Sequence, residues 1–502
     1  MKISMNSRNF VFGTIFFALL GITACEKKDD KKLTINTSES KQTSVSQWFP
    51  ADKSQPLTIK VIDQSNKPIV DAQVLIGNYQ GRPFKDNFLS TDKNGLVSIP
   101  REDWTAPANV TADANMHVRQ TLILQKPGNI VIRMNPSQLR QRAKITGVVN
   151  GLPIVNGDKY IDFGLVMTSL SKADLFNFDV GNVISPYADT LSAVGQEFSV
   201  PSNVSIPAQK EKYIINITLD KPIYSLYLPS YGTKRLFSTA GKFVFKPVVD
   251  ELRNGKPFYE LINYFNLTGG TLREINVNSP ETQLNFPAQE LAFNKTVQVK
   301  SPKINSDEVF LSLTANEVGG QLVPTGVRKL NSLESADLTT IEGSPLFLVS
   351  ALKRQSEFMG NAPGGDRISA SMLPYVKDLD GALLPLIANP TIKTAEGYVV
   401  TSPTIAAPSQ ITRLAVFAAV SDVFDDTVDG KKVTTLVKRW DVLATQWPNQ
   451  LALPNWPLDS QPTTNKKRFE VNFIGGLNAP PQELGDDLVQ AATHVTRSSI
   501  DF

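Results

Sequence analysis

The chain has 502 residues, of which 51 are lysine or arginine and 48 are aspartate or glutamate, so its formal net charge is +3. This near balance provides no strong positive field, which argues against nucleic acid as a partner. A single cysteine excludes an internal disulfide, so the stability of the protein must come from buried cores. The length predicts about three domains of ordinary size.

The first 24 residues have the three-part layout of a secretory signal peptide. Lys2 and Arg8 give a basic start, residues 10–22 form an apolar run, and Thr23 and Ala24 are small. The run is shorter than the roughly 20 apolar residues that a permanent membrane-spanning helix needs. We predict that residues 1–24 are cleaved off as a signal peptide. Loss of two basic residues then lowers the net charge from +3 to +1.

The end of this segment, Ile22-Thr23-Ala24-Cys25, resembles the lipobox of bacterial lipoproteins. The resemblance implies cleavage between Ala24 and Cys25 and attachment of fatty acyl chains, such as palmitate, to Cys25. More than one inserted chain gives a stable membrane anchor. Glu26, rather than aspartate, follows the cysteine, and the sorting rule of the family then favours the outer membrane, with the body at its periplasmic face or on the cell surface. The alternative is an ordinary signal peptide with a chance cysteine at its cleavage site.

Residues 25–55 are predicted to form the lipidated N-terminus and a disordered linker. The segment mixes charges of both signs with serine and threonine and has few large apolar residues. Such a composition cannot offset the entropy lost on folding. A random coil of about 30 residues has an r.m.s. reach of roughly 30 Å, which separates the body from the lipid headgroups.

Residues 56–136 begin with the alternation of a half-buried strand, because Leu57, Ile59 and Val61 lie two residues apart. Asn94-Gly95 then marks a tight turn. The segment resembles the carboxypeptidase regulatory-like domain, a transthyretin-like β-sandwich of the immunoglobulin-like class. The matching residues are Val61-Ile62-Asp63, Pro68, Ala72, Val74, Thr91-Asp92, Asn94-Gly95 and Val97. The resemblance implies a non-catalytic module used for spacing, folding support or binding.

The rest of the chain also reads as mainly β, with short alternating apolar segments separated by turn residues. We predict tandem immunoglobulin-like β-sandwich domains: a β-rich domain at 143–300 with a small helical insert near residues 246–267, and sandwich-like domains at 301–400 and 401–502. The last two share a Val-x-Ser-Pro start, at Val299 and Val400, which suggests a duplication. The final segment, THVTRSSIDF, is typical of a closing edge strand.

The sequence contains few candidate catalytic residues. The chain has two histidines, His117 and His494, and they lie in different predicted domains, so a histidine-based zinc site or serine triad is not indicated. Each is interpreted as a partly exposed strand histidine. We found no phosphate or dinucleotide motif and predict no cofactor and no metal. Paired carboxylates for glycoside chemistry leave no local spacing and remain an alternative.

Two clusters are candidate sites. Trp440, Trp447 and Trp456 lie in a proline-rich stretch and could form a stacking platform for sugars or a partner protein, or the indoles could simply pack against the last domain. The second cluster is a weak calcium candidate that a solvated hairpin tip explains better. Its members are Asp422, Asp425, Asp426 and Asp429.

The sequence therefore predicts a lipid-anchored bacterial envelope lipoprotein that is not an enzyme. In this hypothesis its β-modules bind or adhere to a protein or glycan partner. Two alternatives remain: a carbohydrate-active hydrolase with a paired-carboxylate site in residues 143–502, and a purely structural spacer of the envelope.

Overall fold

The computed structural model describes sixteen stretches of the chain, and residues 44–502 form one compact unit. The described residues are 45–77, 88–137, 143–152, 159–170, 188–193, 196–212, 216–228, 231–358, 367–377, 381–393, 399–401, 405–428, 431–445, 447–454, 466–477 and 484–502. The predicted signal peptide and Cys25 lie outside them. Within these stretches, no helix has the length and apolar character that a membrane crossing requires.

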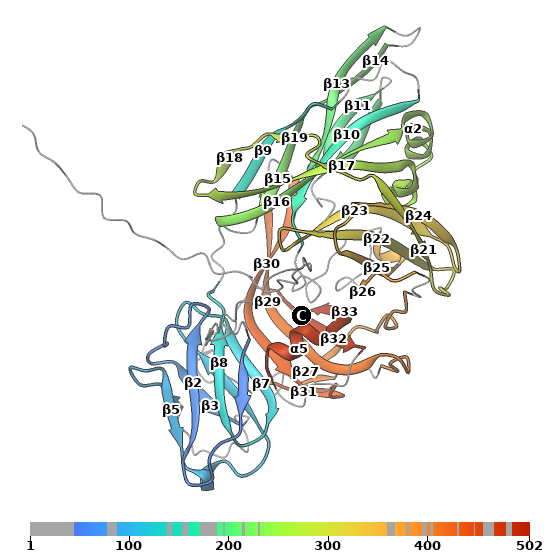
Figure 1. Cartoon of the computed structure of the whole chain (residues 1–502). Helices are drawn as coiled ribbons and strands as arrows, with labels where there is room; N and C mark the ends of the chain where they lie inside the picture. Colours follow the sequence, from blue (N-terminus) through green and yellow to red (C-terminus); the bar gives the residue numbers. More distant parts are fainter. Residues whose placement is uncertain are drawn as a thin grey trace, which may run out of the picture. The chain divides into compact units, whose positions relative to one another are not determined.

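The N-terminal part, blue in Figure 1, starts with a four-stranded sheet whose order is β1-β8-β2-β5. Its strands are β1 (Gln47–Phe49), β2 (Leu57–Asp63), β5 (Leu96–Ile99) and β8 (Asn129–Met134). The alternation at Leu57, Ile59 and Val61 is confirmed, since all three side chains are buried in one core. Trp48 on β1 also packs against this core, and its Nε1 donates to the Lys126 carbonyl over 3.1 Å. The folded body thus begins before residue 55, where we had expected the linker to end.

The opposite layer of this N-terminal part belongs to a twelve-stranded sheet. The strands of the N-terminal part in it are β3 (Gln73–Ile76), β4 (Leu89–Ser90), β6 (Ala108–Asp113) and β7 (Arg119–Gln125), and a 3-10 turn, η1 (Arg101–Asp103), precedes β6. The remaining strands are β22 (Glu308–Val318), β23 (Gln321–Leu330), β25 (Leu346–Arg354), β26 (Ile368–Pro374), β29 (Thr412–Val428), β30 (Lys431–Ala444), β32 (Lys467–Gly476) and β33 (Ala492–Asp501). Their order is β23-β22-β25-β26-β33-β32-β29-β30-β7-β6-β3-β4.

Two sets of four strands in this sheet repeat one plan, as the duplication predicts. In the first repeat β22 pairs with β23 and β25, and β25 pairs with β26; in the second β29 pairs with β30 and β32, and β32 pairs with β33. Each repeat carries a small covering sheet. The first has β21 (Lys295–Lys300) paired with β24 (Ser335–Thr340), and the second has β28 (Val399–Thr401) paired with β27 (Thr391–Lys393) and β31 (Gln450–Ala452).

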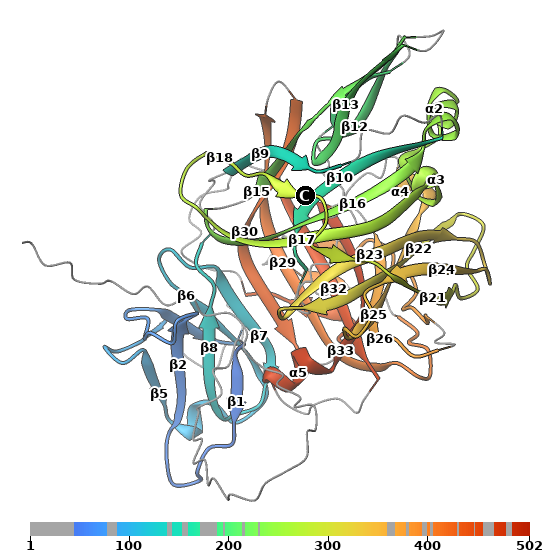
Figure 2. The same ribbon diagram turned by 45° about the horizontal axis from the view of Figure 1, so that its top comes forward.

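The repeats are not separate sandwiches, however. Ile368–Ser371 of β26 pair antiparallel with His494–Arg497 of β33, so β33 is an internal strand and not the closing edge that its alternation suggested. Figure 2 shows β26 and β33 next to each other. Strand β7 also pairs with β30, in parallel. Pairing between strands far apart in sequence leaves no local pattern, which is why three predicted domains proved to share one sheet.

The middle part, green in Figure 1, contains two further sheets and a hairpin. The first sheet has the order β14 (Asn216–Lys221), β13 (Val204–Lys212), β10 (Tyr160–Thr168), β16 (Gly232–Val244), β17 (Phe265–Val277) and β20 (Leu291–Ala292). The second has the order β15 (Ile223–Leu228), β9 (Ala143–Asn150) and β18 (Glu281–Gln283), with β19 (Phe286–Pro287) also paired to β9. The hairpin joins β11 (Ala188–Ala193) and β12 (Gln196–Pro201).

The helical insert is confirmed. Its elements are α2 (Phe245–Arg253), α3 (Phe258–Leu261) and the 3-10 turn η3 (Ile262–Tyr264); two short helices, α4 (Gln355–Phe358) and α5 (Asp486–Ala491), lie elsewhere. Gly255 ends the first helix in a left-handed conformation, with φ of 72°. Val248 and Val249 of α2 are buried in the same core as Phe163 and Phe243 of the middle sheet. The insert thus caps its own part of the chain. With strands dominating every described part, the mainly β fold class is confirmed.

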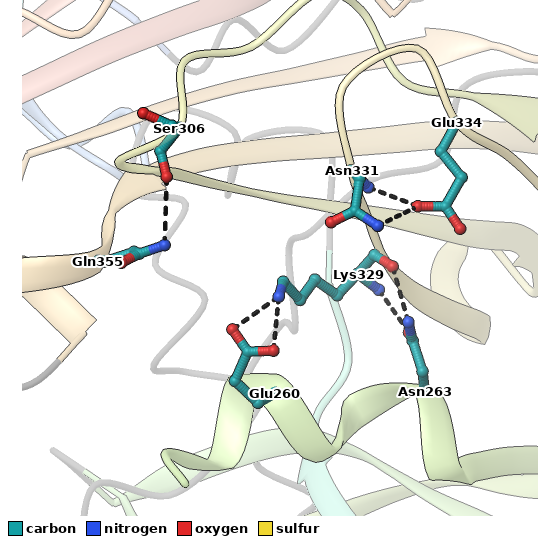
Figure 3. A network of polar contacts seen from close by, with 7 residues as sticks. All are labelled: Glu260, Asn263, Ser306, Lys329, Asn331, Glu334 and Gln355. Carbon is teal, nitrogen blue, oxygen red and sulfur yellow. Dashed lines mark hydrogen bonds and ion pairs between the residues drawn. The ribbon is translucent and has the colours of Figure 1, made fainter.

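The outer edge of the first repeat is closed by this insert, as Figure 3 shows. The Asn263 side chain imitates a paired strand, because its Nδ2 donates to the Lys329 carbonyl over 2.9 Å and its Oδ1 accepts from the Lys329 amide over 2.8 Å. The Lys329 ammonium donates to both oxygens of Glu260, each over 2.6 Å. Leu170 and Leu322 exchange main-chain bonds further along β23. These contacts block edge-to-edge association through β23.

A glycine on β9 tests how tightly the middle sheets pack. A Cβ on Gly147 would overlap the Leu284 carbonyl oxygen, so Gly147→Ala must displace backbone. We expect a loss of about 1–3 kcal/mol in the free energy of unfolding, as for other overpacked sites. Chemical denaturation measures it. The control is Gly485→Ala, whose Cβ would have no atom within 4 Å. Equal unfolding midpoints for the two variants would contradict this packing.

Candidate functional site

The predicted lipidation site is separated from the folded body by a short stretch of chain. Ala24 and Cys25 lie outside the described residues, and the described chain starts at Val45. The interval of about twenty residues spans at most roughly 70 Å when fully extended. An acylated Cys25 would therefore keep the body within that distance of the membrane surface.

Trp440, the first member of the predicted aromatic platform, is a core residue. Its side chain is only 3% exposed, and its Nε1 donates to the Thr121 hydroxyl of β7 over 2.8 Å. The Arg119 guanidinium covers the ring at 4.7 Å from its centroid and pairs with Asp113 at 3.2 Å. This tryptophan joins β30 to β7. The signal was present in the sequence, because Trp440, Val442 and Ala444 alternate as one buried face of a strand.

Trp447 is also held by packing. Its Nε1 donates to the Ile474 carbonyl over 2.9 Å, and its ring meets Phe473 edge to face at a centroid distance of 5.4 Å. The Arg413 guanidinium lies 5.6 Å from the centroid of the same ring. Trp456, the third member, lies outside the described residues. For Trp440 and Trp447 the structure favours the alternative interpretation, in which the indoles pack against their own domain.

The aspartate cluster lies on the β29–β30 hairpin, whose paired residues reach Val428 and Lys431. Asp422 is buried, and its carboxylate accepts from Arg439 Nε over 2.7 Å, so an arginine occupies the place that a calcium ion would need. Asp429, and the side chain of Asp426, lie outside the described residues. Across the described stretches, no three histidine, cysteine, aspartate or glutamate side chains are grouped to hold a metal. The hairpin interpretation accounts for Asp422 and Asp425.

The two histidines differ in environment. His117 is half-buried in a turn, with Nδ1 2.8 Å from the Asn115 carbonyl. His494, which we expected to be partly exposed, is 1% exposed, and its Nε2 donates to the Ala382 carbonyl over 3.0 Å. Since Nε2 carries the proton, Nδ1 accepts from the Thr493 hydroxyl at 2.7 Å. Burial lowers the pKa of His494 to about 4. The imidazole is therefore neutral over the ordinary pH range.

His494 belongs to a set of side chains on one sheet face that hold the coil of residues 381–390. Thr496, two residues along β33, donates to the Pro385 carbonyl over 2.9 Å, and Ser498 donates to Asn389 Oδ1 over 3.2 Å. Ser369 on β26 donates to the Leu384 carbonyl. Leu384 and Ile387 are buried beneath the coil. These bonds give His494 a structural task and leave it unsuited to act as a base on an external substrate.

The opposite face of the second repeat carries an unexpected group of polar and charged side chains. Cross-strand partners point to the same face of a sheet, and the register aligns two rows. One row runs Ser499, Glu470, Ala419 and Asp441, and the next contains Arg497, Asn472 and Phe417. We call the following side chains the polar face: Lys438, Asp441, Glu470, Asn472, Arg497 and Ser499.

The polar face is internally paired but not fully satisfied. Lys438 Nζ lies 3.1 Å from Asp441 Oδ1, an ion pair without the geometry of a hydrogen bond, and Arg497 lies 3.8 Å from Glu470. Asn472 Nδ2 donates to the Phe417 carbonyl over 3.3 Å and to Glu470 Oε1 over 3.1 Å. These two acceptors fix the orientation of the amide. Asn472 Oδ1 and Asp441 Oδ1 are then buried without a hydrogen-bond donor among the described residues.

This site was not foreseen from the sequence. Glu470, Asn472, Arg497 and Ser499 each alternate with apolar or neutral residues, which is the ordinary pattern of a solvent-facing strand side. Only the register of four strands brings them together. Their low exposure is the feature that sets them apart, because Asn472 is 0% exposed and Asp441 is 4% exposed. Buried polar groups lacking a partner are uncommon and call for an explanation.

Comparison with known proteins gave no assignment. No protein-family model and no curated protein matches the chain. Among solved structures, the chain is similar to the Bacillus anthracis TIE protein, with 9% identity over 65% of this chain and 48% of that one, and a TM-score of 0.15. The chain thus spans about half the length of that protein. It is also similar to a variant of BcpA, the major pilin subunit of Bacillus cereus, with 9% identity, 71% and 96% coverage, and a TM-score of 0.14. Scores this low do not establish a shared fold.

The buried His494 predicts acid sensitivity. Its pKa is lowered to about 4 in the folded protein, whereas an unfolded histidine titrates near 6.5. Unfolded chains therefore bind a proton that folded chains do not bind. Above pH 6.5 this group leaves the free energy of unfolding unchanged, and as the pH falls from 6.5 toward 4 it lowers that free energy. The loss amounts to about 3 kcal/mol. Urea denaturation across this range should show it.

The matched variants for this measurement are His494→Gln and His117→Gln. The His494→Gln variant should lose most of the stability change between pH 6.5 and 4, because the glutamine amide does not titrate. His117→Gln should keep it. A wild-type slope in the His494→Gln protein would show that carboxylates, and not this imidazole, cause the acid sensitivity.

The bond between Trp440 and Thr121 predicts a measurable coupling across the β7–β30 contact. Trp440→Phe keeps an aromatic ring but removes the Nε1 donor, and it should cost about 1–2 kcal/mol of unfolding free energy. A double-mutant cycle with Thr121→Val should show a coupling energy of about 1 kcal/mol. Strict additivity of the two substitutions would contradict the bond.

Proposed function

We propose that this protein is a lipid-anchored bacterial outer-membrane lipoprotein whose β-built body binds a protein or glycan partner without catalysing a reaction. The single observation that carries the proposal is the position of the only cysteine. Cys25 follows a signal-like segment, completes the sequence Ile22-Thr23-Ala24-Cys25 and is followed by a polar stretch that ends where the folded body begins. Acylation there would tether the body to a membrane, at its periplasmic face or at the cell surface.

The body suits a binding role. The N-terminal part, which we propose to be a carboxypeptidase regulatory-like module, is joined to the second repeat through β7 and β30 over residues Arg119–Leu122 and Trp440–Leu443. Such a joint holds the modules without disulfides. Two of the residues with catalytic potential have structural tasks, since His494 holds the coil over the sheet and Asp422 pairs with Arg439. Recognition through a fixed surface requires no more than this framework.

Replacement of the cysteine tests the anchor. Cys25→Ser should abolish incorporation of labelled palmitate and leave the signal segment attached, because lipoprotein processing acts on the cysteine thiol. Mass spectrometry of the N-terminal peptide and fractionation of membranes report the outcome.

The matched control is Thr23→Ser, which keeps a small residue before the cleavage site and should be processed and acylated like wild type. Native protein with an unmodified Cys25, or with residues 1–24 still attached, would overturn the proposal.

A further inference from the structure

The described chain begins at one end of the N-terminal part. The Ser46 side chain is buried there, and its hydroxyl accepts from the Arg133 amide over 3.0 Å. The Arg133 guanidinium donates to the Asp63 carbonyl over 3.1 Å and to Asn66 Oδ1 over 2.6 Å. The first described residues therefore lie against the turn that follows β2.

Three further segments share this end. Gln64 Nε2 donates to Asn135 Oδ1, and the Val118 amide donates to the Asn135 carbonyl, each over 2.8 Å. The Val61 amide donates to the Gly95 carbonyl, also over 2.8 Å. We call the residues gathered here the linker end, and they are residues 64–71, 92–95, 114–117 and 135–136.

Apolar side chains of the linker end face solvent. Val70 is 51% exposed and Met116 is 58% exposed, and Pro68 and Pro136 are also exposed. Met116 has a left-handed backbone with φ of 61°, a conformation that asparagine or glycine adopts at lower cost than a bulky residue. An apolar side chain is thus held out to solvent at a position where a polar residue would be less strained.

The exposed charges of the linker end are balanced. Lys67 and Lys93 are positive, and Asp71 and Asp92 are negative. A strongly acidic or strongly basic partner would therefore gain little from this end. Attraction to a partner must come from apolar contact.

The length of chain that precedes the described residues indicates which partner fits. About twenty residues separate Cys25 from Val45, and they span at most roughly 70 Å. A bilayer that holds an acyl chain on Cys25 always lies within that distance of the linker end. Such linkage replaces free encounter by a high effective concentration, so a small apolar contact is sufficient.

We propose that the linker end rests on the surface of the membrane that holds Cys25, with Met116 and Val70 inserted at the level of the lipid headgroups. This inference rests on the proposed lipid anchor and adds a second contact with the same bilayer. The anchor limits the distance of the body from the membrane, and the linker end fixes which side of the body faces it.

The test uses the acylated full chain in vesicles of phosphatidylethanolamine and phosphatidylglycerol. An acylated Cys25 has no free thiol, so Asn115→Cys adds a single site for a fluorescent dye beside Met116. Lipids with brominated acyl chains should quench this dye. They should not quench a dye attached through Lys303→Cys, on an exposed loop of the first repeat.

Two variants of the labelled protein test the apolar contact. Met116→Asn and Val70→Thr should each lower the ratio of docked to undocked protein by about fivefold, because less apolar surface enters the bilayer. Asparagine suits the left-handed backbone and threonine keeps the shape of valine, so both variants should remain folded. Thermal unfolding checks this, and either variant alone serves if the other does not fold.

The matched control is Leu333→Asn. Leu333 is 61% exposed and left-handed, with φ of 63°, but it lies in the first repeat. Its replacement should leave the quenching unchanged.

Three results would overturn the inference: an unquenched dye at position 115 in vesicle-bound protein with an acylated Cys25, quenching that neither variant reduces, or an equal loss in the Leu333→Asn protein. Mass spectrometry of the same sample reports the acylation of Cys25. Failure of the linker-end contact in acylated protein therefore leaves the anchor proposal standing, whereas an unmodified Cys25 would remove the anchor itself.

Discussion

The pairing of β26 with β33 is the interaction on which the rest of the body depends. Each of the two repeats ends in a strand that would otherwise expose a row of unpaired main-chain groups, and such edges promote association between molecules. The antiparallel ladder over Ile368–Ser371 and His494–Arg497 removes both edges at once. It converts two small sandwiches into one continuous sheet. Covering sheets then need to bury only one face of each repeat.

The outer strands of the two repeats are also paired with segments from other parts of the chain. The outer strand of the second repeat, β30, receives β7 of the N-terminal part, and Trp440 and Thr121 join them by a buried hydrogen bond. The outer strand of the first repeat, β23, receives Asn263 and Leu170. A protein that lacks disulfides in its body thus obtains its connections from hydrogen bonds between distant segments. The bond between Trp440 and Thr121 is buried, and its loss would leave polar groups without partners.

Features of the fold that depend on residues close together in the sequence could be predicted, whereas features that depend on residues far apart in the sequence could not. Alternation identified the strand at Leu57, Ile59 and Val61, and helical spacing identified the insert that contains Val248 and Val249, because both patterns are local. The shared start at Val299 and Val400 indicated the duplication. The merger of the repeats could not be predicted, since no short-range pattern specifies which edge strands meet. For Trp440 the sequence offered two interpretations, a surface platform and packing against the last domain, and the alternation around it agrees with the second, which the structure favours.

The same argument explains why the candidate site escaped sequence reasoning. In the sequence, Glu470 and Asn472 look like solvent-facing residues of β32, and Arg497 and Ser499 look like solvent-facing residues of β33. Register places them opposite one another and beside Asp441. The described edges of the second repeat are engaged by other strands, so its polar side chains gather on a face of the sheet and not along an edge. The amide of Asn472, which donates to the Phe417 carbonyl and to Glu470, is fixed in the buried interior of this face, where its remaining oxygen has no donor among the described residues.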